Sequence, residues 1–100
     1  MTMTELNSEQ VRALLAPLWE KNRGHVLRRL ANVRRALDAS ADPDQSVRDD
    51  LHALAGTLGT YGWPEGSELA ETILDALSGR NDLTRGELVR RLDALTATLP

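Results

Sequence analysis

Apolar residues recur at the spacing of an α-helix along the whole chain, and this pattern limits the fold more than any other feature. In each of five segments they return every three or four residues, which places them on one face of a helix. No segment shows the sustained period of two that is typical of a strand. The five stripes are Val11, Leu14, Leu15, Leu18 and Trp19; Val26, Leu30, Val33 and Leu37; Val47, Leu51, Leu54 and Leu58; Leu69, Ile73 and Leu77; and Leu88, Leu92, Leu95 and Leu99. The sequence therefore predicts an all-α protein.

The first two stripes predict two helices. The first helix is expected to begin at Asn7 or Ser8, because either side chain can cap a helix N-terminus. Pro17 lies inside its apolar pattern, so a kink or an early end is expected there. The second helix is expected to follow from Arg23. The first helix would then be a short leading element before the main bundle.

A break at 40–41 precedes the third helix. Asp42 is expected to cap this helix, with Pro43 in its first turn, where a missing N–H costs nothing. The fourth helix is expected to start near Pro64 or Ser67. Gly79 is its expected C′ residue, since a left-handed residue commonly ends a helix.

The last helix has a matched start signal, because Thr84 and Glu87 stand at the spacing of a capping box. The connections between the helices are about 3–7 residues long, which favours antiparallel neighbours. The predicted fold is an antiparallel up-down four-helix bundle with an additional short N-terminal helix.

Composition restricts the chain to one domain and a few classes of protein. Its 100 residues, 41% of them hydrophobic, suffice for a single core, so 1–100 is expected to be one domain with 1–6 flexible. The chain has no cysteine, which excludes disulfides and fits a cytoplasmic protein. The net charge of −3 argues against nucleic acid as the main partner. No apolar run approaches the roughly 18 residues that a membrane span needs.

One histidine lies where a core residue is not expected. Projecting the third helix at about 100° per residue puts His52 about 130° from the centre of the apolar stripe, so its imidazole should face solvent. The same exposed side is expected to hold Arg48, Asp49, Ala55, Gly56 and Gly59. Each exposed helical glycine costs about 0.8–1.0 kcal/mol relative to alanine. Close approach of another surface beside His52 would explain that cost.

A simpler interpretation stays open at this point. His52 can be an ordinary exposed histidine, with Gly59 marking the end of its helix. The other histidine, His25, stands beside Gly24 near the start of the second helix but has no glycine face, and it is interpreted as a surface or boundary residue. Two histidines far apart in a chain without cysteine do not support a metal site.

The segment from His52 to Trp63, with Leu69, Ala70 and Ile73 after it, resembles the signature of histidine-containing phosphotransfer (HPt) domains. In that signature a helical histidine is followed by an apolar residue two positions on, usually a lysine three on and a glycine four on. A small residue and a further glycine precede an amphipathic helix. The upstream apolar pattern is similar to the first helices of the family, so the resemblance covers nearly the whole chain.

The resemblance implies a phosphorelay intermediate that carries a phosphoryl group on His52. It takes the group from the aspartyl phosphate of a receiver domain or from a histidine kinase and passes it on. The partner would supply Mg²⁺ and the catalytic groups, so no cofactor and no enzymatic activity of its own are expected. Partner docking is expected at Ala55, Gly56 and Gly59, on a protein that is monomeric and binds neither nucleic acid nor membrane.

One position departs from the family pattern. Ala55 stands where the family usually has lysine, which would neutralise the roughly −1.5 to −2 charges of the phosphoryl group. Arg48, one turn before His52, is the nearest candidate to replace it, whereas Asp49 would repel the group. Two alternatives to phosphotransfer therefore remain: a phosphorylation-silent module that binds and titrates a receiver or kinase, and a purely structural or dimerising bundle.

Overall fold

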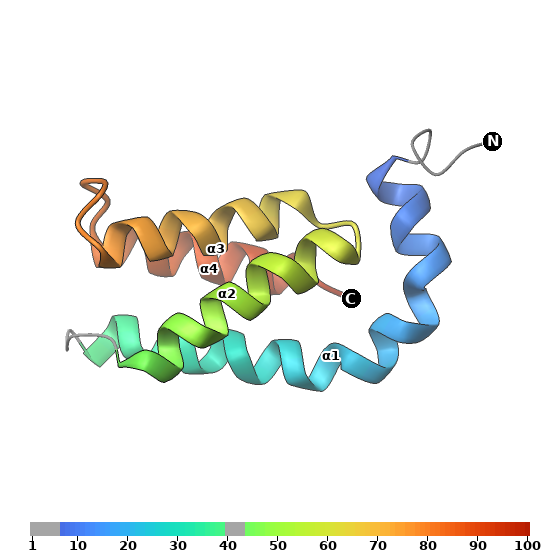
Figure 1. Cartoon of the computed structure of the whole chain (residues 1–100), viewed down its shortest axis with the longest axis horizontal. Helices are drawn as coiled ribbons and strands as arrows, with labels where there is room; N and C mark the ends of the chain where they lie inside the picture. The colour runs from blue at the N-terminus through green and yellow to red at the C-terminus, as the bar shows by residue number, and fades with distance from the viewer. Residues whose placement is uncertain (1–6, 40–43) are drawn as a thin grey trace.

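Helices make up most of the structure, a computed structural model that describes residues 7–39 and 44–100. The described residues form α1 (Ser8–Ala39), α2 (Gln45–Thr60), α3 (Pro64–Leu77) and α4 (Arg85–Thr98), and contain no strand (Figure 1). The predicted all-α class is therefore confirmed. None of the described helices is long and apolar enough to cross a bilayer. Residues 1–6, which were expected to be flexible, lie outside the described residues.

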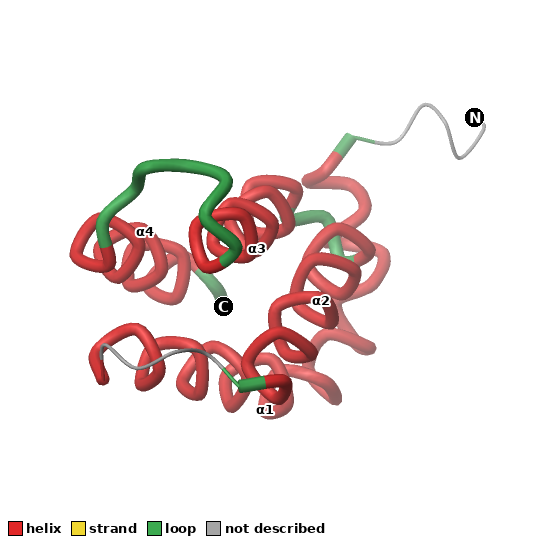
Figure 2. Tube along the Cα trace, turned by 60° about the vertical axis from the view of Figure 1, so that its left-hand side comes forward, coloured by secondary structure: helices red, strands yellow, loops and turns green. Residues whose placement is uncertain are grey.

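The helices surround one hydrophobic core in the order α1, α2, α3, α4 (Figure 2). The predicted apolar stripes supply nearly all of that core. The buried hydrophobic side chains are Trp19, Val26, Leu30, Val33, Leu37, Val47, Leu51, Leu54, Leu58, Trp63, Ala70, Ile73, Leu88, Leu92 and Leu95. Burying leucine, valine and isoleucine contributes roughly 1.5–3 kcal/mol for each side chain, so these stripes provide the main driving force for folding.

The separate leading helix is not observed, because the two N-terminal segments form the single 32-residue helix α1 with Pro17 inside it. Figure 1 shows that α1 changes direction in its N-terminal half instead of ending there. A proline has a helical φ but lacks one backbone N–H, so it can bend a helix without ending it. Trp19, just after the proline, is buried and holds the bent part against the core.

The start of α2 differs from the sequence expectation. Its N-cap is Asp44, whose carboxylate accepts a hydrogen bond from the Val47 N–H at 3.1 Å. The Ser46 hydroxyl also donates to Asp44, at 2.8 Å, and these hydrogen bonds lower the pKa of the Asp44 carboxyl. The expected cap Asp42 and the following Pro43 lie outside the described residues.

The other predicted boundaries are confirmed. α3 begins at Pro64, and Gly79 beyond its end has a φ of 77°. At that end the Arg80 N–H donates to the Asp75 carbonyl oxygen at 2.8 Å, which closes the last turn as a left-handed glycine allows. At the start of α4 the Thr84 hydroxyl accepts from the Glu87 N–H at 3.1 Å, while the Glu87 carboxylate accepts from the Thr84 N–H at 3.2 Å.

This capping box gives a first testable expectation. Thr84→Ala should lower the free energy of unfolding by about 1 kcal/mol, because it leaves the Glu87 N–H in the first turn without its side-chain acceptor. Thr84→Ser keeps the hydroxyl and should stay close to the parent protein. Urea denaturation followed by circular dichroism measures both. Equal midpoints for the two variants would show that the box does not stabilise α4.

Candidate functional site

His52 lies in the middle of α2 on the side away from the core. Leu51, Leu54 and Leu58 of the same helix are at most 1% exposed, whereas His52 is exposed. Within the described residues no hydrogen bond or ion pair engages its imidazole. The ring nitrogens are therefore accessible to a reactant from solvent, and the predicted outward orientation of His52 is confirmed.

Contacts with α1 fix one flank of α2. The Asp50 carboxylate accepts a hydrogen bond from the Asn32 amide at 2.7 Å and lies 3.6 Å from the Arg29 guanidinium. Farther along, the Tyr61 hydroxyl accepts from the Asn22 amide at 2.8 Å. These two contacts bracket the level of His52 and determine how far α2 can rotate.

Contacts with α3 fix the other flank, and they change the interpretation of two site residues. The Ser67 hydroxyl donates to the Ala55 carbonyl oxygen at 2.7 Å, and Ala55 is half-buried. A Cβ on Gly59 would lie 3.5 Å from the Ser67 Oγ. Gly59 thus lies at the crossing of α2 and α3, and Ala55 is not on the fully exposed face where the sequence placed it. Sequence reasoning missed Ser67, since nothing local shows which α3 residue meets Gly59.

Gly56 is the position that leaves bare backbone beside His52. It follows the histidine by one turn, is exposed, and an added Cβ would meet nothing within 4 Å. No packing within the described residues requires a glycine here, although glycine costs about 0.8–1.0 kcal/mol in a helix interior. At Gly59 an added Cβ would make an ordinary van der Waals contact with Ser67, so packing in the described residues requires a glycine at neither position, and Gly56 is the one with fully open space around it.

The charged neighbours of His52 on α2 are both engaged elsewhere. The Arg48 guanidinium donates to the Ser78 hydroxyl at 3.3 Å and so reaches the end of α3. The Asp49 carboxylate accepts from the Gln45 amide at 2.9 Å. Both contacts lie on the protein surface, where side chains exchange partners readily. In this arrangement Arg48 is directed to α3, not to the imidazole.

His25 is in a different environment, on α1. Its Nδ1 lies 2.6 Å from an Arg28 guanidinium nitrogen. Because arginine can only donate, Nδ1 accepts and the ring proton of a neutral His25 is on Nε2. The ring is thus engaged by Arg28, whose guanidinium also lies 3.6 Å from the position of a Cβ added at Gly24, the glycine beside it. His52 is therefore the stronger candidate for chemistry.

The comparison with known families decides what this helix arrangement is. The family model of the Hpt domain matches residues 18–99, which is most of the chain. The chain belongs to the Hpt domain family. No curated protein and no solved structure gives a significant match. Hpt domains transfer phosphoryl groups through a histidine in phosphorelays, where they interact with receiver domains or kinases and act as carriers rather than catalysts.

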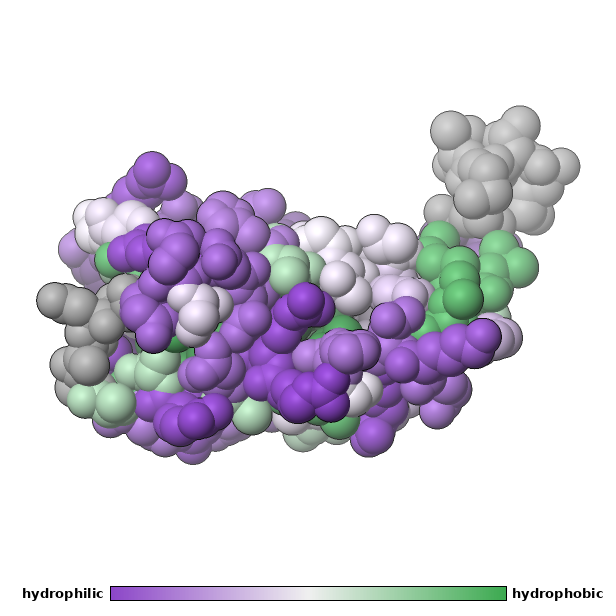
Figure 3. Space-filling view, turned by 60° about the horizontal axis from the view of Figure 1, so that its bottom comes forward, coloured by the Kyte–Doolittle hydropathy of each residue, from purple (hydrophilic) through white to green (hydrophobic). Residues whose placement is uncertain are grey.

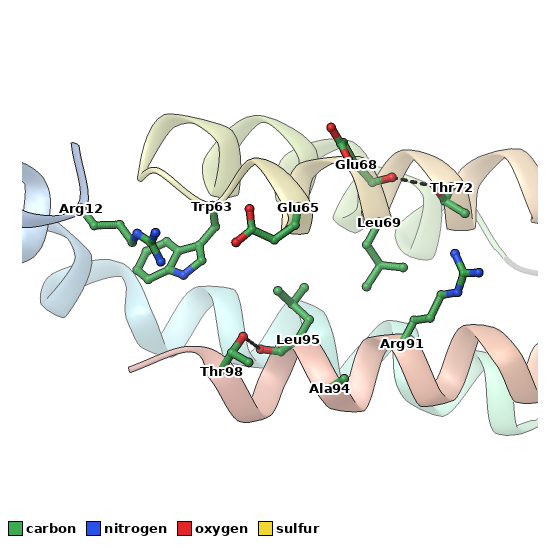
Figure 4. A pocket seen from close by; sticks show the side chains of 10 residues that line it. All are labelled: Arg12, Trp63, Glu65, Glu68, Leu69, Thr72, Arg91, Ala94, Leu95 and Thr98. Carbon is green, nitrogen blue, oxygen red and sulfur yellow. Dashed lines mark hydrogen bonds between the residues drawn. The ribbon is translucent and has the colours of Figure 1, made fainter. Parts of the chain in front are cut away.

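This Hpt domain also has a groove of about 500 Å³ between α3 and α4 (Figure 4). Leu69 and Leu95 face each other across it, and Arg12 lies over the Trp63 ring at 5.3 Å from its centroid. The full lining is Arg12, Trp63, Glu65, Glu68, Leu69, Thr72, Arg91, Ala94, Leu95 and Thr98. His52 is not among these residues, so the accessible histidine of the Hpt domain lies on open surface outside this groove.

Proposed function

We propose that this Hpt domain carries a phosphoryl group on His52 between receiver-domain aspartates, or from a histidine kinase to a receiver. The observation that carries the proposal is an accessible imidazole, without a partner in the described residues, beside the open backbone of Gly56 in a chain of this family. Gly56 is the centre of the proposed docking surface. Ala55 and Gly59 form its edge toward α3.

The transfer step needs little from this chain. The lone pair of one imidazole nitrogen, Nε2 as the family resemblance implies, attacks phosphorus in line with the departing aspartyl oxygen. A P–N bond forms as the P–O bond breaks, and the aspartate leaves as a carboxylate. The receiver supplies Mg²⁺ and the groups that stabilise the equatorial oxygens, because phosphoryl transfer depends mostly on positioning and electrostatics. His52 contributes the nucleophile and α2 contributes its position.

Radiolabel transfer from a panel of phosphorylated receiver domains tests the proposal. The parent chain should acquire label that is stable to base and labile to acid, as expected for phosphohistidine. His52→Gln should acquire none, while His25→Gln should be labelled like the parent. Label that persists in His52→Gln, or that is lost in His25→Gln, would assign the phosphoryl group to another residue and overturn the proposal.

One feature favours a second function, a phosphorylation-silent module that binds and titrates a receiver or kinase. The family's usual lysine is replaced by Ala55, and Arg48 contacts Ser78. No cation is then directed to the site of the phosphoryl group by the contacts of α2. Receiver binding without any label on the parent chain would select this silent module over the carrier.

The same feature predicts a gain from restoring the cation. Ala55→Lys should lengthen the half-life of phosphohistidine several-fold, because its ammonium would offset part of the roughly −1.5 to −2 charges beside it. Ala55 is half-buried, but a lysine stem can lie along the α3 contact with its charge in water. Ala55→Gln has similar length without the charge and should leave the half-life unchanged. The decay of label after removal of the donor measures both variants, and equal half-lives would contradict the electrostatic explanation.

A further inference from the structure

The exposed surface around His52 has opposite charges on its two sides. We infer that this polarity fixes the direction in which a receiver domain docks. The partner that fits is a receiver whose docking face is acidic where it covers α1 and basic where it covers α3. The inference rests on the proposed function, since it concerns the receiver that exchanges phosphoryl groups with His52.

The α1 side of the surface is basic. Asn32 donates to Asp50 of α2, so the residues that precede Asn32 at helical spacing lie along the α2 side of α1. Arg28, four residues before Asn32, is exposed, and so is Lys21, which lies two turns before Arg28 on the same row of the helix. Together with Arg29, which lies 3.6 Å from Asp50, Lys21 and Arg28 form the basic edge. Asp50 offsets the charge of Arg29 only, so the edge remains positive.

The α3 side of the surface is acidic. Ser67 and Ser78 contact α2, through Ala55 and Arg48 respectively. Glu71, four residues after Ser67, and Asp75, three before Ser78, lie between them on that side of α3. Glu71 is exposed and the Asp75 side chain is 47% exposed. Glu71 and Asp75 form the acidic edge.

Two cations lie close to the acidic edge without reversing its sign at His52. The Arg80 guanidinium is 3.4 Å from the Asp75 carboxylate, beyond the end of α3. Arg48 is at that same end, on Ser78. Glu71 has no ion pair within the described residues and lies at the level of His52 between the two serine contacts. It is therefore the uncompensated charge nearest the middle of this edge.

The surface between the two edges is formed by exposed residues of α2, namely His52, Gly56 and, toward the N-terminus of the helix, Asp49. Among the described residues, the exposed large hydrophobic side chains are Leu14 at 63% and Leu18 at 49%. They lie in the N-terminal part of α1, where Figure 3 shows a hydrophobic area. Charges flank the histidine itself. A partner lying across Gly56 meets both edges at once. Turning that partner by 180° would oppose like charges at both edges and disfavour the complex.

Matched charge reversals test this polarity with a receiver that labels the parent chain. Arg28→Glu and Glu71→Lys should each slow association with that receiver about tenfold at low ionic strength, which is the smallest change in association rate typical of electrostatic steering. The effect should decrease at high salt because exposed charges are screened. Arg90→Glu on α4 and Asp82→Lys between α3 and α4 make the same changes in net charge at exposed sites. These two controls should change the rate less than about twofold. Phosphoramidate, a small donor that needs no docking, should label His52 equally in all four variants.

The outcomes separate this inference from the proposed function. If the receiver still labels His52 and the two reversals behave like their controls, the polarity is wrong and the carrier function stands. If Glu71→Lys speeds association while Arg28→Glu slows it, the partner face is acidic throughout and the inferred orientation is overturned. If no receiver binds or labels the chain, both proposals fail.

Discussion

Replacing Gly56 by leucine should leave the bundle folded while reducing phosphoryl transfer from a receiver to His52 about 100-fold. Gly56 is exposed and a Cβ added there meets nothing within 4 Å, so the leucine side chain can extend into solvent. Leucine in place of a helical glycine should instead stabilise α2 by roughly 0.5–1 kcal/mol. The transfer falls because the side chain stands where the receiver must lie, and a displacement of about 1 Å in a reacting complex can cost a factor of about 100.

A matched glycine on another helix makes this prediction specific. Gly86 is exposed near the start of α4, which packs against α1 and α3. Gly86→Leu should fold and transfer like the parent. Urea denaturation measures the stability of each variant, and rapid-quench transfer from the labelled receiver measures the rate. Full-speed transfer by a folded Gly56→Leu variant would show that the receiver does not lie over Gly56.

The helices could largely be predicted from sequence because their signals are local. The spacing of leucines and valines, the pair Thr84 and Glu87, and Gly79 each act within one or two turns, and most of them are placed as expected. The exceptions are Leu14 and Leu18 of the first stripe, which are 63% and 49% exposed because the bent start of α1 leaves the core.

The effect of Pro17 could not be predicted from local sequence, since a proline can either bend a helix or end it. The bend is favoured here by a tertiary contact, the packing of Trp19 on Trp63 with ring centroids 4.7 Å apart.

The surface around His52 could be predicted only in part, since it depends on which helices cross beside it. Helical projection placed His52 and Gly56 on the exposed side of α2, as observed. It could not show that Ser67 of α3 meets Ala55 and Gly59, because that contact depends on helix packing between segments distant in the sequence. The reach of Arg48 to Ser78 has the same origin. The projection placed Gly56 and Gly59 on one exposed face of α2. In the structure Gly56 leaves open backbone, whereas Gly59 lies where α3 crosses α2.

The largest effect on stability is expected at the turn between α2 and α3. Gly62 has a φ of 89°, and a Cβ there would lie 2.6 Å from the Ser8 carbonyl oxygen and 2.9 Å from the Arg12 Cγ. The Ser8 oxygen belongs to the main chain of α1, so the first turn of that helix would have to move. Gly62→Ala should therefore lower the free energy of unfolding by about 2–5 kcal/mol, combining the strain of a left-handed residue with overpacking.

Gly79→Ala separates these two causes. Gly79 has a φ of 77°, but an added Cβ meets nothing within 4 Å, so this variant carries the backbone strain alone, about 1–2 kcal/mol. The excess loss in Gly62→Ala, measured by denaturation of both variants, reports the contact between the turn and α1. Ser8 and Arg12, which a Cβ at Gly62 would meet, precede the family match that begins at residue 18. The excess loss of stability therefore measures how strongly the N-terminal part of α1 packs on the Hpt bundle. Equal losses in the two variants would mean that the first turn of α1 adds nothing at Gly62.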